Sequence, residues 1–517
     1  MNGGSTEEPV KPWMGGARNQ EKSEALPRFS AAYQSAFSDR TQVRAVFYLI
    51  VALVVVASVA WRVGNLDAFS LTNDEGAYLM WAWLVHSGHP LYSETVSVSA
   101  PFFILALDWA FDLAGVSLVT GRALVLGFLG LALFILAWAD KLLHGWLAGV
   151  MAALAFSKAP LAFGLSRMAL GEIPSVALAI LSVAVALAYW RHGGWGWLAL
   201  SGLAYGLSLL IKALNPLVIL PVLWLILSHQ RHSQASWSRA AIALAVWGLA
   251  GLLPVFVSLL IFDPVALYDQ AFAFRMELRA AFPWLLADNV KQLGHFLGQQ
   301  LGIALLALTG ILLLARKALW PVLLPLMLWL VGSLLTVLFH SPLFAHHTII
   351  LLPPLALLAG IGFAETIALL QERRWAWSAL GLAGVLAFSL ALPGAVRANQ
   401  TLREASFGRE AEAITFLEQI THSSDNVISD NLLLPFMAGR QTPPPLGDVA
   451  QVAIDSGRQT SERLIAISET YPVEAVANWA LRLPHLDNYM KWVESNYLVR
   501  RVWDDYHVIY FGRRVPA

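Results

Sequence analysis

The chain has 517 residues, of which 57% are hydrophobic and only 13% are charged, and its mean hydropathy is +0.61. This composition excludes a soluble globular protein, because the polar residues are too few to cover a domain of this length, and it predicts a polytopic α-helical membrane protein. The chain has no cysteine, which excludes disulfides, thiolate metal sites and cysteine nucleophiles. Its formal net charge is zero, which gives no reason to expect a nucleic-acid partner.

Residues 1–43 are polar and mixed in charge, so we expect a flexible cytoplasmic tail without a cleavable signal peptide. Residues 44–395 are expected to form the transmembrane domain, with about 11 apolar segments close to the roughly 20 residues that a span needs. The segments lie at about residues 44–63, 118–139, 145–165, 172–190, 195–211, 214–228, 240–262, 297–315, 319–339, 347–367 and 375–394. The two short segments around Lys212–Pro216 could also be one bent span.

Basic residues near the spans predict the orientation, because cytoplasmic loops are enriched in Lys and Arg. With the N-terminus in the cytoplasm, the cytoplasmic side holds Arg40, Arg44, Lys141, Arg191, Arg231, Arg239, Arg316, Lys317, Arg373 and Arg374. A smaller set falls on the outer side, namely Arg62, Arg122, Lys158, Arg167, Lys212, Arg275, Arg279 and Lys291. Some of these would snorkel to the interface, and others could bind an anion. We therefore expect a multi-pass plasma-membrane protein in contact with membrane lipids.

The first outer loop, residues 64–117, contains the run Leu71-Thr72-Asn73-Asp74-Glu75-Gly76-Ala77-Tyr78. Adjacent carboxylates at the membrane surface suggest a functional site, because ionisable groups are costly beside hydrocarbon. Asp74 could take part in chemistry, or it could cap a helix that begins near Gly76. Residues 101–115 of this loop are apolar but too short for a span, and they carry Asp108 and Asp112, which predicts an interfacial helix.

A second outer loop, residues 263–296, is rich in aromatic and charged side chains. It is either an interfacial helix with an aromatic belt or a mobile cover over a substrate site. His340, His346 and His347 gather in the short outer turn before the tenth span. Three histidines suggest a metal site, but their spacing matches no fixed ligand set.

After about residue 395 the composition changes, and residues 396–517 predict a small α/β domain that lies outside the membrane by the parity of the spans. Helices are expected at 408–420 and 460–471, and strands at 427–429, 497–502 and 507–511. We find no catalytic constellation here, and Pro443–Pro445 indicates a turn. A role of this domain in acceptor binding would rest on its position alone.

Several short motifs follow one another along residues 44–395. They are Asp74-Glu75 with Tyr78, Gly88-His89-Pro90-Leu91-Tyr92, Ala100-Pro101, Gly121-Arg122, Ser166-Arg167, Glu172-Ile173-Pro174, Leu210-Ile211-Lys212, and His346-His347 before Leu351-Leu352-Pro353-Pro354-Leu355. In this order they resemble the GT-C superfamily of membrane glycosyltransferases, above all its protein O-mannosyltransferase and aminoarabinose (lipid A) transferase branch. The resemblance implies a GT-C fold and a hexosyl or pentosyl transferase. It would move a monosaccharide, with inversion, from a polyprenyl-phosphate donor to a lipid, glycan or protein acceptor at the outer face of the plasma membrane.

The same resemblance implies roles for the acidic residues. Asp74, the first acid of the loop, would be the general base that accepts the proton of the attacking hydroxyl. Glu75 would assist it or bind sugar, metal or a backbone amide, and Tyr78 would contact the donor. Glu172 stands where the family usually carries Asp; with Asp74 it would hold a divalent cation such as Mg²⁺ or Mn²⁺, although this branch does not uniformly need one. Otherwise Glu172 complements the dipole of its helix.

Basic residues at matching positions would stabilise the leaving phosphate. These are Arg167, Lys212 and Arg122, with His346 and His347 contacting phosphate or sugar. The alternatives are that Arg167 and Lys212 are snorkelling anchors and that Arg122 fixes the loop against the second span.

Other classes of function stay open at this point. A lipid or glycan transporter or flippase would place charges near the bilayer midplane and show paired halves, whereas the notable charges here lie at the outer ends of the spans and no internal repeat is found. A non-catalytic scaffold on the same fold would tolerate Asp74→Asn. A ligase for oligosaccharides or polymers would share the lipid-linked donor. The sugar and the acceptor are not identified by the motifs.

Overall fold

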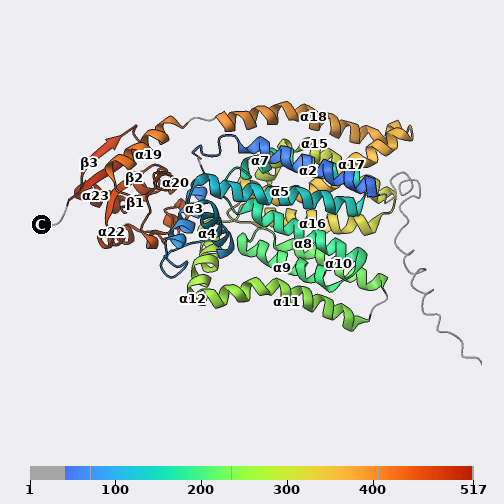
Figure 1. Cartoon of the computed structure of the whole chain (residues 1–517), viewed down its shortest axis with the longest axis horizontal. Coiled ribbons are helices and arrows are strands. Elements are labelled where there is room, and N and C mark those ends of the chain that lie inside the picture. Colours follow the sequence, from blue (N-terminus) through green and yellow to red (C-terminus); the bar gives the residue numbers. More distant parts are fainter. Residues whose placement is uncertain (1–40, 70–71, 234–235, 405–406, 515–517) are drawn as a thin grey trace, which may run out of the picture.

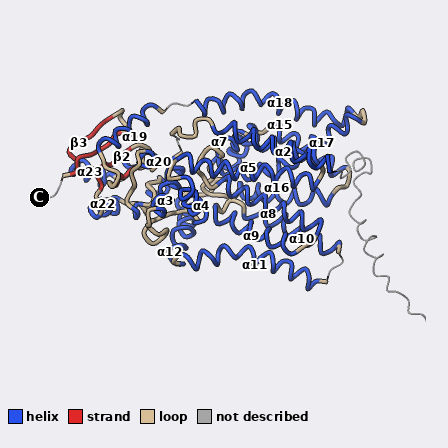
Figure 2. The backbone as a smooth tube through the Cα atoms, viewed as in Figure 1, coloured by secondary structure: helices blue, strands red, loops and turns tan. Residues whose placement is uncertain are grey.

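The computed structural model describes residues 41–69, 72–233, 236–404 and 407–514. Figures 1 and 2 show a bundle of long helices, with a smaller part that contains the strands at one end of it. Helix α2 (Thr41–Val63) begins at the opposite end and runs toward that smaller part. The predicted tail 1–43 lies outside the described residues except for its last three positions, where α2 has already begun.

The bundle consists of the helices that hydropathy predicts, since each apolar segment falls on a helix. After α2 they are α5 (Leu118–Leu143), α6 (Trp146–Lys158), α7 (Pro160–Leu165), α8 (Glu172–His192), α9 (Trp195–Ile211), η2 (Pro216–Val218) with α10 (Ile219–His232), α11 (Trp237–Ile261), α15 (Leu301–Arg316), α16 (Trp320–Phe339), η4 (Ala345–Leu351) with α17 (Leu352–Gln371), and α18 (Trp375–Glu404). Six of the described helices are long and apolar enough to cross a membrane, or seven if α15 and the preceding α14 (Leu286–Gln299), bent by 90°, form one span. The total of about 11 crossings stays a prediction, because the remaining apolar helices are shorter.

Two of these spans form the centre of the bundle and others face outward. In the most apolar stretch of each helix, the buried share is 89% for α8 and 94% for the segment Ala345–Gln371. The corresponding share is only 22% for α2 and 17% for α11. Lipid supplies no hydrophobic drive for helix association, so close backbone approach matters. Gly202 and Gly206 of α9 meet α11 so closely that an added methyl group would clash with the carbonyls of Trp247 and Gly251.

The first outer loop forms two helices, α3 (Asn73–His86) and α4 (Pro101–Ala114), so the helix predicted at 101–115 is confirmed. Phe103 and Leu107 of α4 are buried, whereas Trp109 is 60% exposed. Burial on one face fits an interfacial position, which itself stays a prediction.

The second outer loop is not one helix. It forms α12 (Pro264–Leu267), a π-helical turn η3 (Tyr268–Ala273), α13 (Phe274–Ala281) and the first part of α14. Arg458 of the C-terminal part holds it, donating to Glu277 at 2.6 and 2.8 Å and to Asp269 at 3.0 Å twice. The guanidinium also lies over the ring of Phe274, 5.5 Å from its centroid.

The C-terminal part contains a four-stranded sheet in the order β1-β2-β4-β3, with β1 parallel to β2 and the other pairs antiparallel. The strands are β1 (Asn426–Ser429), β2 (Val473–Asn478), β3 (Tyr497–Val502) and β4 (Val508–Arg513), and the helices are α19 (Gly408–Ile420), α20 (Leu433–Met437), η5 (Pro444–Leu446), α21 (Gln451–Asp455), α22 (Ser461–Thr470), η6 (Leu483–His485) and α23 (Asp487–Asn496). The three predicted strands and both predicted helices are present. Strand β2 was missed, and the proposed domain border after residue 395 falls inside α18.

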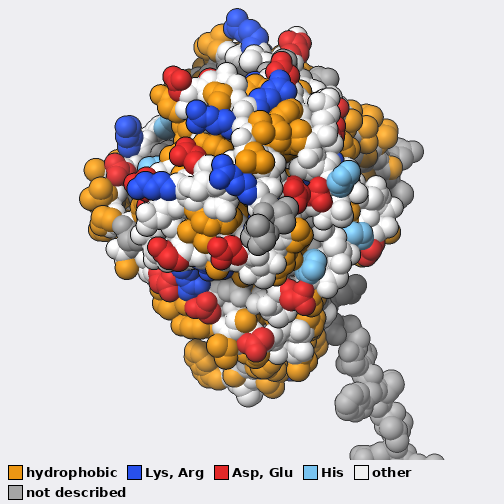
Figure 3. All heavy atoms as spheres, turned by 90° about the vertical axis from the view of Figure 1, so that its left-hand side faces the viewer, with side chains coloured by type: hydrophobic (Ala, Val, Ile, Leu, Met, Phe, Trp, Pro, Cys, Tyr) orange, Lys and Arg blue, Asp and Glu red, His pale blue; other side chains and the backbone are white. Residues whose placement is uncertain are grey.

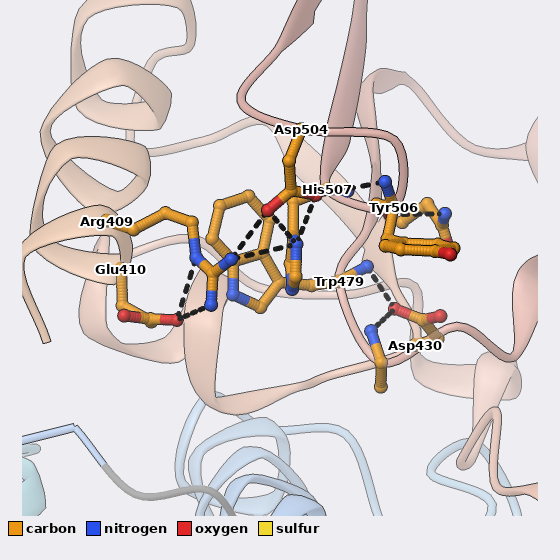
Figure 4. A network of polar contacts seen from close by, with 9 residues as sticks. Arg409, Glu410, Asp430, Trp479, Asp504, Tyr506 and His507 are labelled. Atoms are coloured by element: carbon orange, nitrogen blue, oxygen red, sulfur yellow. Dashed lines mark hydrogen bonds and ion pairs between the residues drawn. The ribbon is translucent and has the colours of Figure 1, made fainter.

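A polar network holds this C-terminal part together (Figure 4). The Asp430 carboxylate, directly after β1, accepts hydrogen bonds from the backbone amides of Trp479 at 2.7 Å and Ala480 at 2.8 Å. Arg409 of α19 donates to Asp504 in the β3–β4 turn at 2.6 Å, and His507 closes the group. Figure 3 looks onto this end of the molecule, where acidic and basic side chains are interspersed over the surface. Mixed charge of this kind fits a surface in contact with water.

Candidate active site

Helix α3 places the two loop carboxylates in different environments. The helix begins at Asn73 and its N-cap is Thr72, so the structure does not use Asp74 as the cap. Asp74 is half-buried and, within the described part of the chain, its carboxylate has no hydrogen bond or ion pair. An unengaged carboxylate can accept a proton, which is what a general base requires.

Glu75, in contrast, is completely buried and fully engaged. Arg122 donates to both of its carboxylate oxygens, and the backbone amide of Ala169 adds a third hydrogen bond at 2.7 Å. Arg122 also donates to the carbonyls of Leu66 and Ala68 at 2.8 Å each. This geometry matches the alternatives in which Arg122 fixes the first outer loop against α5 and Glu75 binds a backbone amide; a catalytic role of Glu75 stays a prediction.

Arg167 has a comparable structural position. It donates to the backbone carbonyls of Arg62, in the last turn of α2, and of Gly64 and Asn65, which follow the helix. Cationic groups stabilise such C-terminal carbonyls through hydrogen bonds and the helix dipole. These hydrogen bonds hold Arg167 against the end of α2, and a phosphate contact by this side chain stays a prediction that they do not test.

The structure brings Glu172, Lys212, His346 and His347 together at the same end of the bundle as α3. Glu172, the first residue of α8, forms a buried ion pair through Oε1 with Lys212 Nζ, and this oxygen lies 3.4 Å from His346 Nε2. Its other oxygen, Oε2, is buried and has no hydrogen-bond partner among the described residues. Burial alone would lower the pKa of Lys212, but the charges of Glu172 and Asp74 raise it, so the ammonium is retained.

The three histidines form one cluster beside this pair. The ring of His347 lies 4.4 Å from that of His346 and 4.7 Å from that of His340, centroid to centroid. Burial, followed by the charges of Arg275 and Arg279 from α13, lowers the pKa of His340 to about 4. The charges of these two arginines therefore reach the cluster from the second outer loop, the segment expected either as an interfacial helix or as a cover over a substrate site.

Tyr78 lies one helical turn after Asp74, on the same face of α3. Its hydroxyl accepts a hydrogen bond from Ser99 Oγ at 3.1 Å, and the backbone carbonyl of Ser99 accepts one from Tyr92 at 2.6 Å. The side chain is buried.

Glu172, His346 and His347 could together hold a metal ion. Ligand atoms of Glu172, His346 and His347 all lie within 4.8 Å of one another, and Asp74 is not part of that group. One carboxylate and two imidazoles suit zinc or manganese better than magnesium. Lys212 occupies one oxygen of Glu172, leaving Oε2 as the free donor. The group therefore fits a cation held by Glu172 and the two imidazoles, whereas the expected pairing of Glu172 with Asp74 stays a prediction.

No protein-family model matches the chain, and no curated protein matches it. Among solved structures, ArnT from Cupriavidus metallidurans in the apo state is similar with a TM-score of 0.61 at 16% identity, over 91% of this chain and 98% of ArnT. ArnT bound to undecaprenyl phosphate gives 0.59 at 14% identity over the same shares of both chains.

A second similar structure is the archaeal oligosaccharyltransferase AglB from Archaeoglobus fulgidus, in complex with an inhibitory peptide and a dolichol-phosphate. Its TM-score is 0.53 at 12% identity, over 85% of this chain and 70% of AglB. ArnT and AglB are membrane glycosyltransferases of the GT-C superfamily. At such low identity the similarity shows the fold, and it confirms the GT-C architecture that the motifs predicted.

Proposed function

We propose that this chain, which has the GT-C fold, is an inverting glycosyltransferase that moves a monosaccharide from a polyprenyl-phosphate donor to an acceptor. The observation that carries the proposal is the unengaged Asp74 carboxylate, which lies near a buried group of cations and histidines around Glu172. A base and a site for developing negative charge are the two elements that this transfer needs. The neighbours in complex with undecaprenyl phosphate and dolichol-phosphate support a lipid-linked donor.

The donor phosphate would be held at Lys212, with His346 and His347 beside it and Arg275 and Arg279 approaching from α13. As the bond between the anomeric carbon and the phosphate oxygen breaks, negative charge grows on that oxygen, and prepositioned cations stabilise it. A divalent cation, when bound to Glu172 and the histidines, would supply further Lewis-acid stabilisation. Glu172 keeps the Lys212 ammonium in place by their ion pair.

Asp74 would accept the proton of the acceptor hydroxyl as its oxygen forms a bond to the anomeric carbon on the side opposite the phosphate. The electron pair of the broken bond stays on the polyprenyl phosphate, and the configuration inverts. Tyr78, one turn farther along α3, would position the sugar between Asp74 and Lys212. Glu75, Arg122 and Arg167 would support the walls of this site through their buried hydrogen bonds.

The predicted membrane orientation is part of the proposal. The start of α2 and the C-terminal part lie at opposite ends of the bundle (Figure 1). With the N-terminus in the cytoplasm, as the basic residues favour, the C-terminal part and Asp74 are both on the outer side of the plasma membrane.

The test is transfer of radiolabelled sugar from a panel of polyprenyl-phosphate monosaccharides in native membranes. Asp74→Asn should lower transfer by about 10²-fold or more, as expected for loss of a general base. Asp67→Asn, at an exposed carboxylate of the same loop, is the matched control and should leave transfer unchanged. Transfer by Asp74→Asn at the wild-type rate would remove Asp74 from the mechanism.

A binding arm tests the donor site separately. Undecaprenyl phosphate should raise the melting temperature of the detergent-purified wild type, and Lys212→Met should weaken this stabilisation. Wild-type protein that transfers no sugar from any donor and is not stabilised by the lipid would contradict the proposal and favour a transporter or scaffold.

A further inference from the structure

The C-terminal part packs directly on the helix that carries Asp74. An added methyl group on Gly76, two residues after Asp74, would lie 2.7 Å from the backbone of Leu432 and Leu433 in front of and within α20. Gln441 also donates to Ser87, just after α3, at 2.6 Å. The two parts of the chain therefore share a tight boundary along α3.

One segment of the C-terminal part, residues 443–449, reaches the face of α3 that bears Asp74. Trp81 Nε1 donates to the carbonyl of Gly447 at 3.1 Å. Trp81 is seven residues after Asp74, which is about two turns and about 10 Å along the same stripe of the helix, with Tyr78 between them. The backbone amide of Val96 donates to the carbonyl of Pro444 at 3.2 Å, giving the segment a second anchor on the first outer loop.

Gly447 allows this approach. Its φ of +71° lies in the left-handed region, and an added Cβ would meet Val96 Cγ1 at 3.0 Å. The turn directs the chain so that the next residue, Asp448, follows immediately after the contact with Trp81. Asp448 is half-buried and makes no ion pair within the described residues.

Electrostatics agree with this placement. Burial raises the pKa of Asp448 to about 7; Arg482 opposes the shift, and the negative charges of Asp74 and Asp430 add to it. Asp430 is occupied by backbone amides, whereas Asp74 is not. A carboxyl group with such neighbours does not stabilise the fold at neutral pH, so its presence there calls for a functional reason.

We infer that Asp448 positions the acceptor, so that the C-terminal part completes the active site opposite the donor side. This rests on the proposed glycosyltransferase function and adds the residue that would hold the acceptor beside Asp74. A carboxyl group that both donates and accepts hydrogen bonds suits a hydroxyl group. Because Asp74 and Asp448 both carry negative charge when ionised, the acceptor group that enters between them is a neutral hydroxyl-bearing one, not a phosphate or carboxylate.

The experiment measures transfer from the active radiolabelled donor with increasing amounts of a membrane extract as acceptor source. Asp448→Ala should raise the half-saturating amount of extract about tenfold, the effect of one lost hydrogen bond, while stabilisation by undecaprenyl phosphate stays at the wild-type value. Asp448→Asn retains a donor and an acceptor and should restore most of the affinity. Glu469→Ala, at an exposed carboxylate of α22, is the matched control.

A second measurement does not depend on activity. The chain contains no cysteine, so Asp74→Cys with Asp448→Cys creates a unique pair that a short bismaleimide should bridge across the boundary. Failure to bridge this pair would overturn the inference, as would Asp448→Ala protein that behaves like Glu469→Ala or that loses undecaprenyl phosphate binding together with transfer. If wild-type protein transfers sugar normally while Asp448→Ala is unaffected, only this inference falls. If the wild type transfers nothing, the proposed function falls with it.

Discussion

Arg122 and Glu75 form a bidentate ion pair in which Nε lies 2.8 Å from Oε1 and Nη2 lies 2.7 Å from Oε2, with both side chains buried. Glu75 is the immediate neighbour of Asp74, yet successive residues of a helix point about 100° apart. Helix α3 thus directs one carboxylate into the protein and leaves the other without a hydrogen-bond or ion-pair partner among the described residues. The two acids of this loop therefore lie in different environments.

Glu75→Gln should strongly destabilise the protein, because it leaves the Arg122 guanidinium buried without its counter-charge. Breaking a buried pair on one side costs about 3–5 kcal/mol. The double variant Glu75→Gln with Arg122→Met should recover much of this loss, and Asp74→Asn should stay within about 0.5 kcal/mol of wild type. Unfolding in detergent measures all of them. A Glu75→Gln protein of normal stability that has lost sugar transfer would instead place Glu75 in the chemistry.

Gly76→Ala tests the contact between α3 and α20. The new methyl group would lie 2.7 Å from backbone atoms of Leu432 and Leu433, which cannot move as a flexible side chain does. The expected cost is about 1–3 kcal/mol, seen as a lower melting temperature together with lower sugar transfer. Gly127→Ala in α5, where no atom lies within 4 Å of the new Cβ, is the control. It should be neutral or slightly stabilising. Equal stability of the two variants would show that the boundary is loose.

Much of this architecture was predictable because it depends on local patterns. Hydropathy locates the bundle helices, since a span needs a continuous apolar run. Glu172 and Lys212 also stood out, because charged residues at the ends of apolar helices are conspicuous. Their ion pair required only that α8 and the end of α9 lie side by side.

The partners of Arg122 and Arg167 were not predictable in the same way, although fixing the first outer loop was one of two roles expected for Arg122. Both are basic residues at the outer ends of apolar helices, as Lys212 is, and their partners are backbone carbonyls and a buried carboxylate far away in sequence. Strand β2 was not predicted, because Val473–Asn478 is buried on both faces and its apolar and polar residues do not alternate. Asp448 follows a run of prolines that indicates only a turn, and its proximity to Asp74 arises from the docking of distant segments.

Arg458→Met should loosen the second outer loop. The four hydrogen bonds from this guanidinium to Asp269 and Glu277 are partly exposed, so their loss should change the melting temperature little. Hydrogen exchange of Pro264–Ala281 should nevertheless become faster, because the bonds tie this segment to the C-terminal part. Arg501→Met, which removes a longer ion pair of 4.0 Å with Glu412, is the control. Unchanged exchange in the Arg458 variant would show that apolar packing of Phe274 suffices to hold the loop.

The pKa of Asp448 leads to a prediction about pH. Burial is the largest cause of its rise from 3.8 to about 7, and the charge of Asp74 contributes to it. The folded protein then binds this proton more tightly than the unfolded chain does, so wild-type stability falls as pH rises from about 4 to 7 and stays lower above that. Asp448→Asn has no carboxyl group at this position, so its stability should not show this fall with rising pH.

The melting temperature of Asp448→Asn should therefore exceed that of wild type by more at pH 8 than at pH 5. The difference corresponds to about 1–3 kcal/mol once solvent screening of a half-buried group is allowed for. Glu469→Gln, at an exposed carboxylate, should show no such change between the two pH values. If Asp448→Asn raises the melting temperature equally at pH 5 and pH 8, the Asp448 carboxyl group titrates in its ordinary range. That result would contradict the proximity of Asp74 and Asp448.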